Sequence, residues 1–203
     1  MITIYGMTDS GNCYKPRLLL AKLGRPFRHV EVNSLDGSTR KPDFLAINAN
    51  GKVPVLELDD GRRVAESNAI LLFLAENTRF LPADAYQRAL AYQWLFFEQY
   101  SHEPYVAVRR AIMRYPSRAA EATPERLAAT LTAGNRALAV METHLAAHAY
   151  FVGDELSVAD IGLYAYTQDA AEHGFSVGPA VAGWLDRVRA DPGHVPLGWH
   201  PPA

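Results

Sequence analysis

The chain contains a stretch that is typical of a site for an extended, charged peptide. A loop ending in Gly51 leads into Val53-Pro54, at the head of the apolar segment Val55 to Leu58. Proline is tolerated at a strand start or edge because it has no N–H to donate to the ladder. If the Val53-Pro54 bond is cis, the main-chain N–H and C=O of Val53 turn outward, where a peptide can pair with them as an added strand.

The residues just beyond this stretch supply two charges. Ser67 precedes an apolar run and is predicted to be the N-cap of a helix, whose N-terminus attracts a carboxylate. Glu66 offers a negative charge to an amino group. A zwitterionic amino-acid end at these residues, with the peptide middle on Val53, matches the outline of glutathione. Each feature alone also fits a strand-start proline or an ordinary helix cap, but the combination favours a ligand site.

A third group lies between the first predicted strand and the first predicted helix. Ser10 and Cys13 have the spacing of a thioredoxin-like Cys-x-x-Cys motif, with serine in the exposed leading position. Serine cannot form a mixed disulfide, but its hydroxyl can donate a hydrogen bond to a thiolate and so lower the pKa of the thiol. Ser10 is therefore the predicted stabiliser of a ligand thiolate, although it also fits a turn serine. Tyr5 is a rival hydroxyl.

Cys13 has two open interpretations. A helix N-terminus depresses the pKa of a thiol, which would make Cys13 reactive. Against this, Cys13 occupies the second position of the motif, which precedes a helix packed on the sheet. We expect it to be buried and structural.

These motifs resemble the glutathione S-transferase superfamily. The matching segments are Ser10 to Lys15, Gly51 to Leu56, Glu66 to Ile70, Phe151 to Gly153 and Leu156 to Ile161. They cover nearly the whole chain in the order found in that family. The chain looks like the bacterial, cytosolic, serine-type members, of theta- or zeta-like class, in which the thiolate-stabilising hydroxyl falls on Ser10.

The resemblance also implies further ligand contacts. Asn12 falls where some related classes place a group that contacts the sulfur, and its amide can donate a hydrogen bond. The glycine carboxylate of glutathione needs a cation, for which Lys41 and Lys52 are candidates, with Arg40 as a substitute for Lys41. Each of these cations also fits a solvated surface charge.

The order of predicted elements agrees with two domains. The first part contains strands at Ile2 to Tyr5, Phe27 to Val32, Pro54 to Leu58 and Arg63 to Ala65, and helices at about Cys13 to Leu23, Asp43 to Ile47 and Ser67 to Glu76. This order predicts a mixed sheet in an α/β thioredoxin-like N-terminal domain, residues 1–77. An all-α C-terminal helical domain is predicted for residues 84–203, because apolar residues recur there at helical spacing.

Within the predicted helical domain, the sequence also predicts a kink, a helix cap and candidate pocket residues. Pro104 should kink its helix because proline removes an internal hydrogen bond. Ser157 and Asp160 have the spacing of a capping box. Tyr100, Tyr105 and Tyr164 are candidates for an electrophile pocket between the domains, although such aromatics more often belong to a core. His102 lacks partners at metal-ligand spacing, so no metal is expected.

The composition of the chain limits which classes of partner are expected. The 203 residues have a formal net charge of −2 and no long run of like charge, so neither a nucleic acid nor a membrane is an expected partner. One cysteine excludes an internal disulfide. No secretory signal is evident, and a cytoplasmic location follows as the default. The family resemblance implies a homodimer.

Three functions remain open at this stage. The first is a glutathione transferase that activates the glutathione thiol for addition to a small hydrophobic electrophile. The second is a glutathione-dependent thiol–disulfide oxidoreductase or peroxidase. The third is a non-catalytic protein that binds glutathione or a hydrophobic ligand. Serine in place of cysteine at position 10 argues against the second.

Overall fold

The computed structural model describes residues 1–201, and they form two compact units. The first unit combines residues 1–78 with residues 192–201, and the second is Arg79–Asp191. The sequence interpretation placed residues 192–201 in the helical domain. They belong to the first unit instead, because side chains of the first helix bind their carbonyl groups. Residues 202 and 203 of that predicted domain lie outside the described residues.

The first unit is built on a four-stranded sheet with the strand order β2-β1-β3-β4. The strands are β1 (Thr3–Gly6), β2 (Arg28–Glu31), β3 (Val55–Glu57) and β4 (Arg63–Ala65). β1 runs parallel to β2, while β3 runs antiparallel to both β1 and β4. The predicted mixed sheet is confirmed, and no predicted strand end differs from the structure by more than one residue.

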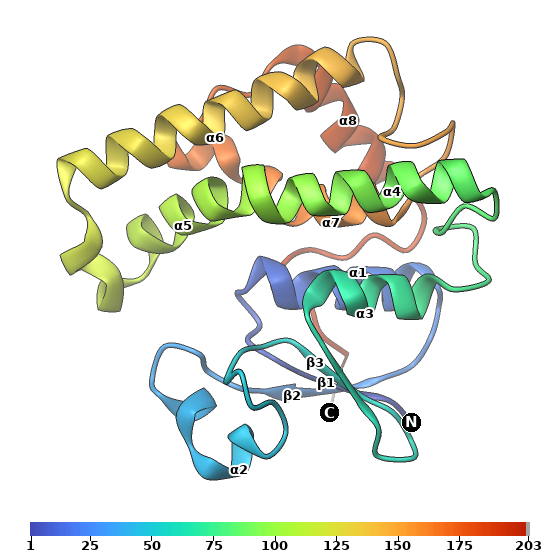
Figure 1. The fold of residues 1–203 in the computed structure, drawn as a ribbon, viewed down its shortest axis with the longest axis vertical. Coiled ribbons are helices and arrows are strands. Elements are labelled where there is room, and N and C mark those ends of the chain that lie inside the picture. The colour runs from blue at the N-terminus through green and yellow to red at the C-terminus, as the bar shows by residue number, and fades with distance from the viewer. Residues whose placement is uncertain (202–203) are drawn as a thin grey trace. The chain divides into compact units, whose positions relative to one another are not determined.

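Helices cover both faces of this sheet. They are α1 (Gly11–Lys22), α2 (Pro42–Leu45) and α3 (Ser67–Ala75), with a 3-10 turn at Ser38–Arg40. Figure 1 shows α1 and α3 side by side above the strands, and α2 below them. The core between the sheet and the upper helices contains Ile4 and Leu56 from the strands and Leu18 from α1, all fully buried.

The second unit is all-α, as predicted, with no strand among residues 79–191. Its helices are α4 (Ala85–Phe97), α5 (Glu103–Arg114), α6 (Pro124–Leu145), α7 (Val158–Thr167) and α8 (Pro179–Ala190), with 3-10 segments at Pro116–Glu121 and Ala170–His173. Every residue of α7 is buried, so this helix forms the centre of the unit. Within residues 1–201, no helix has the length and apolar character needed to cross a bilayer.

Pro104 was predicted to kink its helix, but the structure has a π-helical turn just before the proline instead. Glu98–His102 form a π-helical turn, and α5 begins at Glu103 with Pro104 in its first turn. There the missing N–H of proline has no intrahelical partner to lose. Figure 1 shows α4 and α5 following one another almost in line on either side of this turn.

The predicted capping box at the start of α7 is confirmed. The Asp160 carboxylate is fully buried, and its Oδ2 accepts hydrogen bonds from the Ser157 N–H at 2.9 Å and the Ser157 hydroxyl at 2.8 Å. Its Oδ1 accepts from the Phe151 N–H at 3.1 Å and the Trp184 indole N–H at 2.9 Å. One carboxylate therefore joins the loop before α7 to α8.

Asp160→Ala should destabilise the second unit by about 3 kcal/mol or more, because it leaves several buried donors without an acceptor at about 1–3 kcal/mol each. Urea unfolding followed by circular dichroism measures the change. Asp154→Ala, at an exposed residue of the same loop, should stay within about 0.5 kcal/mol of the parent protein. An Asp160→Ala midpoint equal to that of this control would contradict the role given to the carboxylate.

Candidate functional site

The Ser10 hydroxyl lies at the N-terminus of α1, at the end of the loop that leaves β1. Its Oγ accepts a hydrogen bond from the Cys13 N–H at 3.4 Å, and the Ser10 N–H donates to the Met7 carbonyl at 3.1 Å. Ser10 is thus the N-cap of α1, which explains why the helix starts two residues earlier than predicted. The cap uses the hydroxyl oxygen as an acceptor and leaves the hydroxyl proton for another acceptor.

Cys13 faces the sheet and not the solvent. It is 0% exposed, and a Cβ built on Gly6 of β1 would lie only 3.1 Å from its sulfur. Burial raises the pKa of the Cys13 thiol to about 11, and hydrogen bonding from Ser10 offsets this only partly. The thiol is therefore protonated near neutral pH, in agreement with the predicted structural role.

Ser67 differs from its predicted role as an N-cap. It is the first residue of α3, and the cap position belongs to Glu66. The Ser67 hydroxyl donates to the Asn12 Oδ1 at 3.2 Å and accepts from the Lys15 ammonium at 3.3 Å. It is committed to α1, so the N-terminal amides of α3 are left for other acceptors.

Lys15 was missed by the sequence interpretation. It is buried in α1, and its ammonium donates to the Asn68 Oδ1 at 3.2 Å as well as to Ser67. The available signal was the position of Lys15 next to the apolar run of α1, where a charge must find partners to be buried. Asn12, Lys15, Ser67 and Asn68 together connect the N-termini of α1 and α3.

Glu66 has an unusual backbone conformation at this junction. Its φ of 68° is positive, which is uncommon for a residue other than glycine, and its side chain is exposed. Strained backbone of this kind concentrates at ligand sites. The carboxylate of Glu66 and the N-terminal amides of α3 lie within two residues of one another in the chain.

The Val53-Pro54 peptide bond is cis, the alternative on which the sequence interpretation depended. Within residues 1–201, the main-chain N–H and C=O of Val53 make no hydrogen bond. The loop before Val53 is fixed by the Asn48 amide, which donates to the Lys52 carbonyl at 2.8 Å. Gly51 has a φ of +61°, and a Cβ there would lie 2.8 Å from the Thr39 carbonyl oxygen, so the turn requires glycine.

The three candidate cations differ in whether their charged groups already have a partner. Arg40 donates from Nη1 to the Asn50 carbonyl at 3.0 Å, which ties it to the loop. Lys41 and Lys52 are exposed, and neither ammonium forms an ion pair or hydrogen bond within residues 1–201. These two lysines are better placed than Arg40 to meet an anion.

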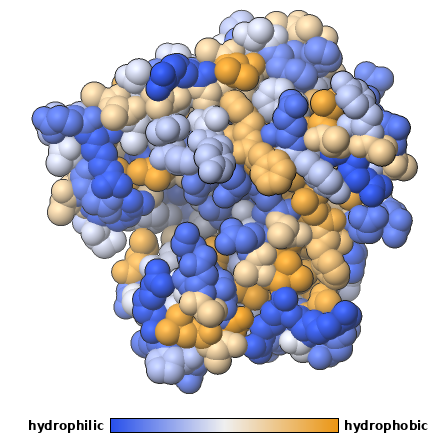
Figure 2. All heavy atoms as spheres, in the orientation of Figure 1, coloured by the Kyte–Doolittle hydropathy of each residue, from blue (hydrophilic) through white to orange (hydrophobic). Residues whose placement is uncertain are grey.

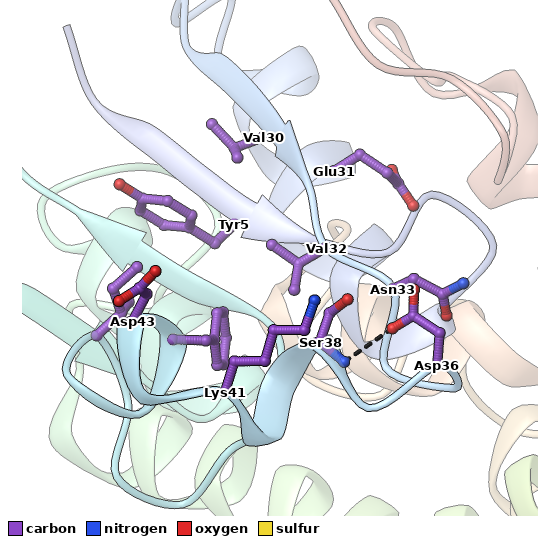
Figure 3. A pocket seen from close by; sticks show the side chains of 11 residues that line it. Tyr5, Val30, Glu31, Val32, Asn33, Asp36, Ser38, Lys41 and Asp43 are labelled. Carbon is purple, nitrogen blue, oxygen red and sulfur yellow. Dashed lines mark hydrogen bonds between the residues drawn. The ribbon is translucent and has the colours of Figure 1, made fainter.

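Lys41 also lines a cavity of about 470 Å³ in the first unit. The lining is Tyr5, Val30, Glu31, Val32, Asn33, Asp36, Ser38, Lys41, Asp43, Phe44 and Ile47. Figure 3 shows the Lys41 side chain reaching toward Val32 and Ser38. The lining does not include Ser10, Val53 or Ser67, so this cavity is separate from the residues that would hold a thiol.

The predicted aromatic residues fall in different environments. The Tyr5 hydroxyl donates to the Glu57 carboxylate at 3.4 Å, so its proton is already used. Tyr100 is 85% exposed and Tyr105 is half-buried. Tyr164 is 1% exposed and its ring contacts Trp184 edge-on, with centroids 6.1 Å apart. This burial argues against Tyr164 as a pocket residue, because it packs inside the second unit.

The described part of the chain, residues 1–201, contains no group of three or more His, Cys, Asp or Glu residues placed to hold a metal ion. The candidate site consists of hydroxyl, amide, main-chain, ammonium and carboxylate groups. Such groups can bind a charged peptide and donate hydrogen bonds to a thiolate. The fold defines a protein with a thioredoxin-like domain and an all-α helical domain.

The particular family follows from comparison with known proteins. Residues 9–77 match the model of the glutathione S-transferase N-terminal domain, and residues 90–192 match that of the C-terminal domain. The chain belongs to the glutathione S-transferase family.

Three similar proteins illustrate the range of this family. A crystal structure of a glutathione S-transferase from Pseudomonas fluorescens Pf-5 is 47% identical, covers 97% of this chain and 98% of its own, and has a TM-score of 0.93. A theta class glutathione S-transferase from Xanthomonas axonopodis pv. citri with glutathione bound is 28% identical, with coverage of 95% and 94% and a TM-score of 0.84. The disulfide-bond oxidoreductase YfcG of Escherichia coli K12 is 28% identical, with coverage of 95% and 92%.

Cys13 should resist thiol reagents in the folded protein. A pKa of about 11 compared with about 8.5 for a free cysteine lowers the thiolate fraction by roughly 300-fold near neutral pH. Labelling with a chromogenic disulfide at pH 7.5 should therefore be at least about 100-fold slower than in guanidinium chloride, where one equivalent reacts. Because the chain has a single cysteine, rapid labelling of the native protein would contradict a buried, protonated thiol.

Proposed function

We propose that this protein is a glutathione transferase, which activates the glutathione thiol as a thiolate for addition to a small hydrophobic electrophile. The observation that carries the proposal is the Ser10 hydroxyl at the N-terminus of α1, whose proton is not used by the helix cap. The unpaired main chain of Val53 and the N-terminus of α3 lie in the same unit. The match to the family over both domains supports this assignment.

Glutathione binding is assigned to the first unit. The peptide middle would pair with the main-chain N–H and C=O of Val53, which Pro54 delivers at the head of β3. The amino-acid end would place its carboxylate on the N-terminal amides of α3, at Ser67, and its amino group against Glu66. The exposed ammonium groups of Lys41 and Lys52 are the candidates for the glycine carboxylate.

Ser10 would act as a hydrogen-bond donor and not as a nucleophile. When bound, glutathione supplies the thiol that reacts. The Ser10 hydroxyl stabilises the charged sulfur, and a hydrogen bond to a charged group is worth about 1.5–3 kcal/mol. The Asn12 amide, which is tied to Ser67 through its Oδ1, is the second candidate donor. Holding the thiolate in one place also supplies proximity to the electrophile.

The electrophile and the assembly belong to the same proposal. Tyr100 and Tyr105, near the π-helical turn, remain the candidates to contact the electrophile.

We also infer a homodimer, since each unit exposes large apolar side chains, among them Phe73 in α3 and Phe96 in α4. On the face drawn in Figure 2, hydrophobic side chains gather in patches between hydrophilic ones.

Disulfide reduction is the second candidate function, and the similarity to the oxidoreductase YfcG favours it. The buried and protonated Cys13 is a poor attacking group, so bound glutathione would have to attack the disulfide. A panel of haloaromatics, isothiocyanates, hydroperoxides and disulfides with glutathione separates the two functions. Turnover of disulfides alone would replace the transferase proposal.

Glutathione should bind with much lower affinity after the double change Glu66→Ala and Ser67→Ala. The amino group of the ligand loses the Glu66 carboxylate, and the N-terminus of α3, whose amides hold the ligand carboxylate, loses the hydroxyl that ties it to Asn12 and Lys15. The expected loss is about tenfold or more in Kd, which corresponds to about 1.4 kcal/mol or more. Titration calorimetry measures it. Glu125→Ala, at an exposed acidic residue of α6, is the control and should bind like the parent protein. Full affinity in the double variant would contradict the assigned site.

Ser10→Ala should raise the pKa of the bound glutathione thiol by about one to two units, since one unit corresponds to 1.36 kcal/mol. Conjugation at neutral pH should slow by roughly ten- to hundredfold. The ultraviolet absorbance of the thiolate, followed against pH, measures the pKa directly.

Two controls separate this effect from the loss of a helix cap. Ser10→Thr keeps a hydroxyl and should restore most of the titration. Thr123→Ala removes the N-cap of α6, where the Thr123 side chain accepts from the Arg126 N–H at 3.2 Å, and should leave the thiol pKa unchanged. If Ser10→Ala titrates like the parent protein, Ser10 does not stabilise the thiolate.

A further inference from the structure

The C-terminal tail, residues 192–201, is held against the rest of the first unit by side chains of α1 and of residues 27–29. The Tyr14 hydroxyl donates to the Val195 carbonyl at 2.5 Å. Two ring contacts hold the end of the tail: Phe27 meets Trp199 edge-on with centroids 6.1 Å apart, and His29 stacks on His200 at 5.2 Å. The tail is therefore attached to the unit that contains Ser10, although more than a hundred residues separate it from that unit in sequence.

Arg17 of α1 links this tail to the loop that carries Ser10. Its side chain is 0% exposed, and its Nη2 donates to the Thr8 carbonyl at 2.5 Å and to the Leu197 carbonyl at 3.0 Å. Its Nε and Nη1 are also buried and have no hydrogen-bond partner within residues 1–201. Burying a charge with so few hydrogen bonds is costly. The cost of burying Arg17 is therefore offset only in part by the bridge that its Nη2 makes between Thr8 and Leu197.

Thr8 is held from a second direction by Glu31. The Glu31 carboxylate accepts from the Thr8 N–H at 3.0 Å and 3.1 Å and from the Thr8 hydroxyl at 2.6 Å. It also accepts from His29 Nε2 at 2.9 Å, and the ring of His29 is the one that stacks on His200. Two routes thus lead from the tail to Thr8, one through Arg17 and one through His29 and Glu31.

We propose that the C-terminal tail positions the Thr8–Ser10 loop, with Arg17 as the positioning residue, so that the Ser10 hydroxyl is aimed at a bound thiolate. The inference rests on the proposed function of Ser10. A hydrogen bond to sulfur depends steeply on distance and angle, and Ser10 lies two residues after the clamped Thr8. The tail should therefore affect the reactivity of bound glutathione more than its affinity, since Val53, Glu66 and Ser67 lie on other segments.

The test uses a double variant of the full chain, Trp199→Ala with His200→Ala, which loosens the tail without changing the loop or α1. The pKa of the bound thiol should rise by about half a unit, with a roughly threefold loss of thiolate at neutral pH. The Kd for glutathione should change less than about twofold. Met113→Ala, at an exposed apolar residue of α5 in the second unit, is the control. Circular dichroism verifies that each variant is folded.

A second variant and a second background strengthen the test. Arg17→Lys keeps the positive charge, but an ammonium cannot reproduce the geometry with which the guanidinium reaches both carbonyls, so the thiol pKa should shift in the same direction. In a Ser10→Ala background the tail variant should produce no further shift. A folded tail variant with an unmoved thiol titration would overturn the proposal, and so would a tail effect that adds fully to that of Ser10→Ala.

Amide hydrogen exchange distinguishes failure of this inference from failure of the proposed function. Loosening the tail should speed exchange at the N–H groups of Thr8 and Ser10, which donate to Glu31 and to the Met7 carbonyl. If exchange is unchanged, the tail does not position the loop. If exchange is faster while Ser10→Ala alone leaves the thiol titration unmoved, the positioning role stands and the proposed role of Ser10 is wrong.

Discussion

In the proposed function, the hydrogen-bonding capacity of one hydroxyl group sets the chemistry of the first unit. A serine hydroxyl has one proton to donate and two lone pairs to accept with. At Ser10 the start of α1 uses a lone pair, through the Cys13 N–H. This interaction therefore caps the helix without using the hydroxyl proton. A cysteine in this position would instead offer a sulfur nucleophile, and the protein itself would be the reactant.

Two buried cations of α1 show how the rest of the site depends on this helix. Lys15 connects α1 to the N-terminus of α3 through Ser67 and Asn68, and Arg17 connects it to Thr8 and Leu197. A buried charge is stable only when nearby dipoles compensate for lost hydration. The side chains and carbonyl groups that do so come from three separate segments. α1 therefore fixes their positions relative to Ser10.

Local signals in the sequence were enough for the individual strands, the helices of the second unit and the capping box at Asp160, because each of these is specified by residues close together in the chain. The interactions that could not be predicted from the sequence are long-range. Ser67 looks like an N-cap in sequence, and only its contacts with Asn12 and Lys15 show that its hydroxyl is used elsewhere. The attachment of residues 192–201 to the first unit could not be predicted either, because the carbonyl groups that bind Tyr14 and Arg17 leave no trace in residue type.

The environment of Cys13 determines where reactivity can reside. Its thiol is fully buried with a pKa of about 11, so the protein holds its only sulfur nucleophile in an inert form. A reaction at sulfur then requires a thiol supplied by a ligand, and selectivity depends on what the protein places beside that thiol. The candidate donor for that thiol is the Ser10 hydroxyl, which cannot itself form a disulfide. A buried, protonated Cys13 thus fits the proposed transferase function, in which no step needs the protein to change its oxidation state.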